Sequence, residues 1–163
     1  MTASAPHQKP HMVDDFLDRA GTRAFAKLRR ARNDPRNLSE PFRTLAVVYA
    51  AQGVLDNGGL RYFFESDWPG QPPYELFAQA YRAIGATERA SAIEQAAKEF
   101  AFASPEHDRN RRCELLDGAV GIRIDAIDRQ SVAGRTGENV WSLLAAFARS
   151  HEHAFRRPWW RPW

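Results

Sequence analysis

Two carboxylates, Asp125 and Asp128, stand three residues apart, a spacing that places both on one face of a helix. Paired carboxylates can divide the acid and base roles of a catalytic site. The sequence provides no nucleophile elbow, Gly-rich phosphate loop or His-Glu-x-x-His motif to accompany them. We therefore interpret the pair as solvated helix charges, and we predict that the chain is not an enzyme and needs no cofactor.

Histidine and cysteine side chains give no better candidate for metal chemistry. His151 and His153 are two residues apart, so on a helix they point to different faces and cannot hold one ion together. We predict that His151 lies at the edge of the core. Cys113 is the single cysteine, which excludes an internal disulfide and a thiolate cluster. We expect a half-buried, inert thiol there and no metal site.

Four polar side chains, Asp56, Asn57, Arg61 and Glu65, surround an Asp-Asn-Gly-Gly turn. They could line a notch that binds a protein or a small ligand. The alternative is structural: the first two residues cap a helix, and Arg61 forms an ion pair with Glu65 four residues later. We favour the structural interpretation, because turns and caps select the same residue types.

The last residues form an unusual cationic and aromatic tail over residues 156–163. Tryptophan and arginine dominate protein-binding hot spots, stack on the bases of single strands and occupy membrane interfaces. The rings could instead fold back onto the domain with arginines stacked on them. Fold-back and docking to a partner remain equal alternatives. The candidate interaction residues of the tail are Arg157, Trp159, Trp160, Arg161 and Trp163.

The net charge of +3 arises in this tail, because residues 1–155 carry 20 basic and 20 acidic side chains. The body therefore has no overall field that would attract a polyanion. A basic cluster over residues 29–36 falls at a predicted helix C-terminus, where it complements the helix dipole. It could also contact phosphates.

Apolar residues recur at helical spacing along almost the whole chain, which predicts an all-α fold of six or seven helices in one orthogonally packed domain. Residues 1–12 are expected to be a disordered lead, residues 13–155 the helical domain and residues 156–163 the tail. The lead lacks the apolar stretch of a secretory signal, and the longest apolar run is too short for a membrane span. We therefore expect a cytoplasmic protein.

The predicted helices cover residues 13–31, 39–55, 60–64, 74–84, 87–103, 106–117, the segment around 122–127 and 138–155.

Local signals define several helix boundaries. Ser39 and Thr87 are expected N-caps, and Gly85 is the expected left-handed cap of the helix before it. The isoleucines of residues 122–127 mix two periods, so a strand there is a second possibility.

The turn at residues 56–59 is the most informative local feature. Asn57 and Gly58 suit positive backbone angles, so the turn should close one helix and open another. The structural motif also includes Gly59. We expect the corner to direct Phe63 and Phe64 into the core.

This turn and its aromatic helix, followed by Ile84-Gly85-Ala86, resemble the motif of the bacterial family that includes the DNA-mimic proteins. The resemblance covers residues 40–152. It implies an all-helical domain without a cofactor or known catalytic residues. In that family's founding member, surface carboxylates stand in for DNA phosphates and block a transcription regulator. The neutral body of this chain departs from that pattern, so mimicry is not carried over here.

The favoured hypothesis is a non-enzymatic module that binds another protein, such as a regulator, through the residue 56–65 turn or the tail. The alternative is a nucleic-acid-associated accessory protein that uses the tail and the basic cluster. An enzyme with an unrecognised site ranks last. The sequence does not define the partner or the oligomeric state.

Overall fold

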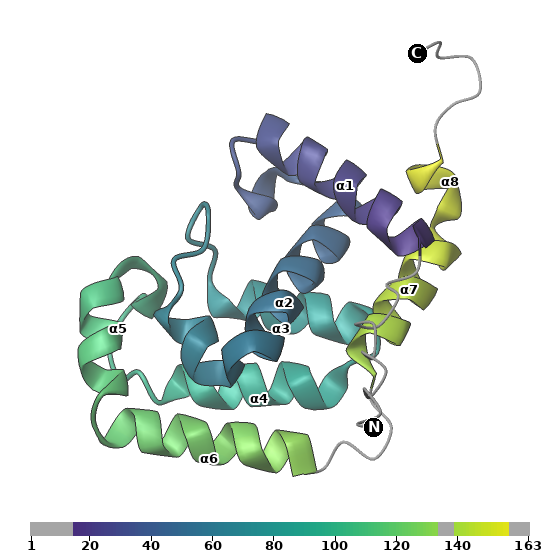
Figure 1. The fold of residues 1–163 in the computed structure, drawn as a ribbon. Helices are drawn as coiled ribbons and strands as arrows, with labels where there is room; N and C mark the ends of the chain where they lie inside the picture. The colour runs from purple at the N-terminus through teal and green to yellow at the C-terminus, as the bar shows by residue number, and fades with distance from the viewer. Residues whose placement is uncertain (1–14, 134–138, 157–163) are drawn as a thin grey trace, which may run out of the picture.

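The computed structural model describes residues 15–133 and 139–156, and within them it is entirely helical (Figure 1). The predicted all-α class is confirmed. The described residues form eight α-helices, because the predicted last helix is divided at His151 and its second part is a single turn. The α-helices are α1 (Asp15–Arg30), α2 (Phe42–Glu65), α3 (Tyr74–Ala83), α4 (Thr87–Lys98), α5 (Arg109–Leu116), α6 (Ala119–Ala133), α7 (Val140–Ser150) and α8 (Glu152–Phe155), with 3₁₀ turns η1 (Pro35–Asn37) and η2 (Pro105–His107).

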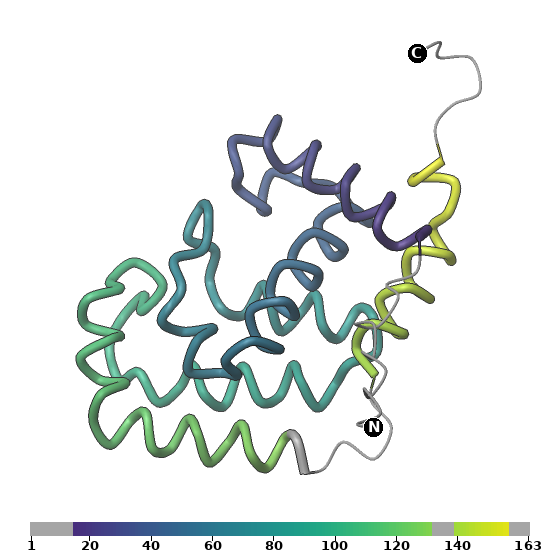
Figure 2. The backbone as a smooth tube through the Cα atoms, viewed as in Figure 1, coloured from purple at the N-terminus to yellow at the C-terminus, as the bar shows by residue number. Residues whose placement is uncertain are grey.

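Helix α2 is the centre of the domain, and it contacts α1, α3, α5, α6 and α7. It runs across the direction of α6 rather than alongside it, while α1 and α6 lie on opposite sides of α2 (Figures 1 and 2). Leu45 and Val48 are completely buried on its inner face. Burial of such apolar side chains is the main stabilising contribution to a helical domain of this size.

Helices α3 and α4 form the antiparallel hairpin that the sequence predicts, joined through Ile84, Gly85 and Ala86. Gly85 adopts φ +87°, the left-handed conformation that favours glycine, and the amide of Ala86 donates to the Tyr81 carbonyl. The prediction for Gly85 is therefore confirmed. The turn packs the two helices closely enough to bury Tyr81 and Ile93 completely.

Two predicted caps are wrong. Helix α2 begins at Phe42 with Pro41 immediately before it, and the amide of Thr44 donates to the Glu40 carboxylate rather than to Ser39. Helix α4 begins at Thr87 itself, so Ala86 occupies the cap position. The isoleucine segment is helical in α6, with Ile124 inside and Ile122 exposed.

The predicted lead of residues 1–12 lies outside the described residues, and so do Arg157, Trp159, Trp160, Arg161 and Trp163 of the tail. The described chain ends at Arg156, which forms an ion pair with Glu152 at 2.8 Å. No helix in the described ranges combines the length and the apolar character needed to cross a bilayer.

Candidate interaction surface at the helical corner

The Asp-Asn-Gly-Gly turn is a sharp corner inside α2. Gly58 (φ −155°, ψ 17°) and Gly59 (φ 64°, ψ −161°) leave the helical conformation. The predicted corner is therefore confirmed, but the positive angle belongs to Gly59 rather than to Asn57 or Gly58. Asn57 donates from Nδ2 to the Gly53 carbonyl at 2.7 Å. It thus closes the helical segment before the corner and does not cap the one after it.

The aromatic rings that follow the corner are buried as the sequence predicts. Phe63 and Phe64 are both completely inaccessible, and their rings meet edge to face at 5.0 Å. Phe63 also packs against Trp68 and Phe77, while Phe64 packs against Phe100. The corner therefore anchors the second half of α2 in the aromatic part of the core.

Asp56 faces α7 instead of a notch beside the turn. Its carboxylate accepts hydrogen bonds from Gln52 Nε2 at 2.6 Å and from Trp141 Nε1 at 2.8 Å. Buried Gln52 in turn accepts a hydrogen bond from the Tyr81 hydroxyl. The expected capping role of Asp56 is wrong, because this carboxylate links α2 to α7 through side chains.

Arg61 turns toward α6. Its guanidinium lies 3.2 Å from the Asp125 carboxylate and donates to the Leu116 carbonyl at 2.7 Å. The prediction that Arg61 pairs with Glu65 is therefore wrong. Helix α6 passes close to the corner, so Arg61 binds the Asp125 carboxylate and the Leu116 carbonyl instead. Glu65 instead accepts a hydrogen bond through its backbone carbonyl from Arg109.

The four sequence candidates therefore do not form one notch, but Arg61 lies among several carboxylates. The hydrogen bond with Asp125 is the largest cause that raises the pKa of the Arg61 guanidinium. Partial burial opposes this rise in the pKa, and the charges of Asp125, Glu65 and Asp117 add to it. Glu65 follows Arg61 by about one turn of α2, and Asp117 directly follows Leu116, whose carbonyl Arg61 binds. We call Arg61, Glu65, Asp117 and Asp125 the Arg61 cluster. It contains three acidic groups and one basic group.

Asp125 and Asp128 share one face of α6 as the spacing predicts, but the prediction that they are simply solvated is wrong. Asp128 pairs with Arg89 of α4 at 3.3 Å, and the Arg89 side chain is only 3% exposed. The sequence did not single out Arg89 as a candidate. A usable signal existed, because Ala86, Arg89 and Ile93 follow the helical spacing of the inner face of α4.

Two large apolar side chains are exposed in the described part of the chain, and both belong to elements that carry the Arg61 cluster. Tyr62 is 48% exposed and follows Arg61 directly. Ile122 is 68% exposed and precedes Asp125 by about one turn of α6. Exposed aromatic and aliphatic groups beside charged ones are typical of protein-binding surfaces.

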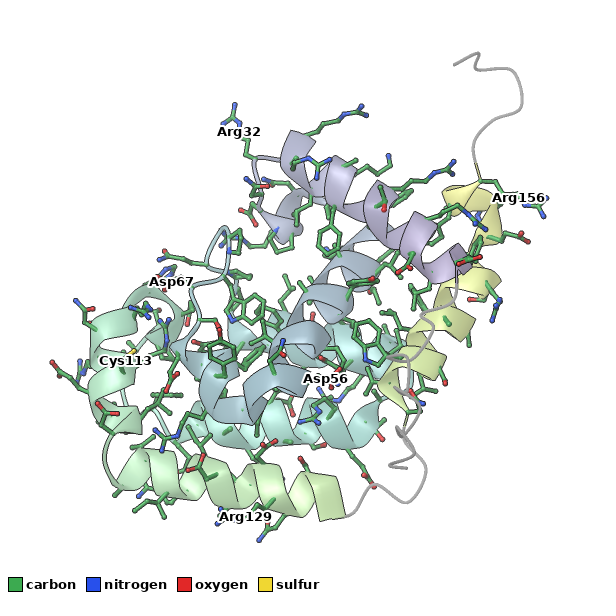
Figure 3. All side chains as sticks on the ribbon, in the orientation of Figure 1. Arg32, Asp56, Asp67, Cys113, Arg129 and Arg156 are labelled. Carbon is green, nitrogen blue, oxygen red and sulfur yellow. The ribbon has the colours of Figure 1, made fainter. Side chains whose placement is uncertain are left out.

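Charge is unevenly distributed over the fold, although the chain up to residue 155 is neutral. Residues 15–37 carry seven basic and three acidic side chains, whereas residues 38–133 carry ten basic and fourteen acidic ones. The basic excess lies on α1 and the turn after it, where Arg32 projects outward (Figure 3). Helix α6 and the corner lie on the other side of the domain. Helix α6 carries two basic and two acidic side chains, and residues 56–65 carry two acidic and one basic.

The remaining candidates occupy ordinary structural positions. His151 contacts the Phe147 ring and its carbonyl at the edge of the core, as predicted, while His153 is exposed. Cys113 is a half-buried free thiol on α5. Over the described ranges, no three or more His, Cys, Asp or Glu side chains gather in a metal-binding arrangement.

The corner with its buried aromatic rings and the α3–α4 hairpin defines a small all-helical domain. The sequence profile described as "DMP19-like protein" matches residues 36–151, a range that contains all of these features. The chain belongs to the DMP19-like protein family. A search of curated proteins and a search of solved structures returned no significant match.

Proposed function

We propose that this chain is a non-enzymatic interaction module that binds the basic, DNA-contacting surface of another protein. The observation that carries the proposal is the Arg61 cluster: Arg61 pairs with Asp125 and binds the Leu116 carbonyl next to Asp117, and Glu65 lies about one helical turn from Arg61. Membership of a family named for a DNA mimic protein supports the same assignment. Carboxylates are the protein groups that can replace phosphates as acceptors for arginine and lysine.

The corner would supply a fixed array of acceptors. Arg61 holds one carboxylate of the cluster, Asp125, by direct hydrogen bonds. A partly ordered acceptor loses less conformational entropy when it binds a cation. Exposed Tyr62 beside the cluster would add apolar contact area, which a purely electrostatic surface lacks.

We place the mimicry of DNA on one face of the domain instead of on its whole surface. The neutral body argued against mimicry at the level of the sequence, because an imitation of DNA needs an anionic array. The Arg61 cluster, with three acidic groups and one basic group, would provide a local array without a negative chain. Local complementarity of this kind steers association and selects partners.

The test is capture of partners by the immobilised full chain, with duplex DNA as competitor. We expect a nucleic-acid-binding protein to be retained in stoichiometric amount and to be displaced by duplex DNA. The double variant Glu65→Gln/Asp117→Asn should retain at most about one fifth as much of this partner protein as the wild type. The matched control, Glu75→Gln on α3, removes an exposed carboxylate outside the cluster and should retain as much as the wild type.

Retention that neither the double variant nor duplex DNA alters would overturn this function. The alternative accessory function makes a different prediction. Under it, the chain itself binds oligonucleotides with an affinity that falls steeply with salt. The triple variant Trp159→Ala/Trp160→Ala/Trp163→Ala would then abolish that binding, which would replace the present proposal.

A further inference from the structure

A second surface lies on the other side of α2 from α6. Helices α1 and α2 and the loop of residues 66–73 enclose an open groove with a volume of about 250 Å³. Its lining is almost entirely carbon and includes Phe25, Leu28, Ala50, Trp68, Pro72 and Phe77. A groove of this size accommodates one or two bulky apolar side chains.

The floor of the groove is held in place before any ligand arrives. Trp68 donates from Nε1 to the Phe63 carbonyl at 3.1 Å, and its ring lies 4.9 Å from that of Phe77. Both contacts orient the indole, so little side-chain entropy is lost on binding. Pro69 and Pro72 stiffen the adjoining loop.

One wall of the groove is clamped to the turn after α1. Arg36 donates from its guanidinium to the Gly70 carbonyl at 2.9 Å while it forms an ion pair with Asp34. Gly70 adopts φ +76° and lies so close to Asp34 that a side chain at this position would collide with the backbone there. The loop therefore approaches the turn closely, and the groove keeps its shape.

The end of α1 beside the groove is strongly basic. Arg29, Arg30 and Arg32 are exposed, and none of them forms an ion pair with another described residue. Arg29 follows Phe25 by four residues and so lies on nearly the same helix face. The groove thus combines an apolar floor with unpaired positive charge at its edge.

We propose that this groove binds a peptide segment of a partner protein in which a bulky apolar side chain is flanked by carboxylates. The apolar side chain enters the space over Trp68, and the carboxylates pair with the arginines at the end of α1. Charge complementarity selects an acidic segment. The carbon lining favours a peptide over a nucleic-acid strand, because phosphates and sugars find no polar partner on the floor.

The probe is a fluorescein-labelled peptide with one tryptophan between two pairs of glutamates, measured by anisotropy with the full chain. Two comparison peptides carry alanine in place of the tryptophan or lysines in place of the glutamates. We expect the acidic tryptophan peptide to bind and both comparison peptides to bind at least about tenfold more weakly. Raising the salt concentration should weaken binding.

Variants of the chain locate the site. Ala50→Phe fills the groove and should reduce affinity about tenfold or more, whereas Ala146→Phe, on an exposed position of α7, should leave it unchanged. Arg29→Gln/Arg30→Gln should reduce affinity several-fold, and the matched control Arg129→Gln on α6 should not. Circular dichroism melts of all variants verify that they are folded.

Several outcomes would overturn the proposal. Equal binding of the lysine peptide, or wild-type affinity in folded Ala50→Phe, would show that the groove does not recognise acidic segments. Sedimentation that shows a dimer lost in Ala50→Phe would assign the groove to a second copy of the chain. Tighter peptide binding by Trp159→Ala/Trp160→Ala/Trp163→Ala would assign it to the tail. Because the Arg61 cluster takes no part, failure here leaves the partner capture above unaffected.

Discussion

Asp128 holds its carboxylate directly against Gly59, in the space that the first atom of any side chain at residue 59 would occupy. The same carboxylate pairs with buried Arg89, so it cannot withdraw without loss of that ion pair. Helix α6 can therefore approach the corner of α2 because residue 59 has no side chain. The approach also brings Asp125 to Arg61, so the candidate surface depends on the same glycine.

Gly59→Ala should destabilise the domain by about 2–4 kcal/mol. Two causes combine, because the backbone at φ 64°, ψ −161° belongs to glycine and the new methyl group collides with Asp128. Urea unfolding measures the change in the free energy of unfolding. Gly53→Ala is the matched control, since its new Cβ meets nothing within 4 Å in the same helix. It should be neutral or stabilising by up to about 1 kcal/mol, and an equal loss in both variants would contradict this account.

The corner and the α3–α4 hairpin could be predicted from the sequence because both are determined locally. Gly85 stops one helix, and the Gly58-Gly59 pair interrupts another, because glycine readily adopts backbone angles outside the right-handed helix. Burial of Phe63 and Phe64 follows from helical spacing after the corner. Here the local preference and the tertiary packing agree.

The partners of the polar residues could not be predicted in the same way. Arg61 has an acceptor four residues away in Glu65 and another in Asp125, 64 positions along the chain. Only the packing of α6 decides between them. Asp56 likewise binds Trp141, a residue 85 positions away. The sequence predicts a local ion pair for Arg61 and a helix cap for Asp56. Tertiary contacts outcompete an exposed local ion pair, which contributes only a few tenths of a kcal/mol.

Arg112 should be among the least replaceable polar residues of the described chain. It is 1% exposed, and its guanidinium donates to the carbonyls of Phe64, Ser66, Pro105 and Glu106. Arg112→Met would leave these carbonyls without their donor and should cost about 3–5 kcal/mol of unfolding free energy. Thermal and urea unfolding measure the loss.

The control for this substitution is Arg129→Met on the exposed face of α6, which should change stability by less than about 0.5 kcal/mol. The unfolding free energy of Arg112→Lys should lie between those of Arg112→Met and Arg129→Met. An ammonium group cannot reach four carbonyls in the planar arrangement of a guanidinium. An Arg112→Met variant as stable as Arg129→Met would show that water replaces the lost donor.

Asp56→Ala should reduce stability by about 1–2 kcal/mol. Gln52 and Trp141 both lose their acceptor, and Gln52 is buried at the junction with Tyr81. Asp56→Asn should recover part of the loss, since its amide oxygen still accepts one hydrogen bond. Urea unfolding measures the stability of both variants against the control Glu114→Gln. Glu114 is exposed on α5, so this variant should be as stable as the wild type. Equal stability of Asp56→Ala and Glu114→Gln would show that α7 is held by apolar contacts alone.

Asp34 should give the stability of the domain a dependence on acid pH. Hydrogen bonds from the Arg36 side chain are the largest cause that lowers the pKa of Asp34 from its ordinary value of 3.8. The folded chain therefore binds this proton less readily than the unfolded chain, and stability rises with pH while the unfolded carboxyl titrates. The contribution is complete above the unfolded pKa and disappears as the pH falls through the lower, folded pKa.

Urea unfolding at about pH 6 and about pH 3 measures this effect. The wild type should lose more unfolding free energy on acidification than Asp34→Asn, whose amide cannot titrate. Arg36→Gln should show the same reduced loss as Asp34→Asn, and the double variant should add nothing, since both substitutions remove one interaction. Equal acid sensitivity of the wild type and Asp34→Asn would show that the carboxylate contributes no pH-linked stability. The loop at Gly70 would then be held against the turn by the Arg36–Gly70 hydrogen bond and by packing, without help from charge.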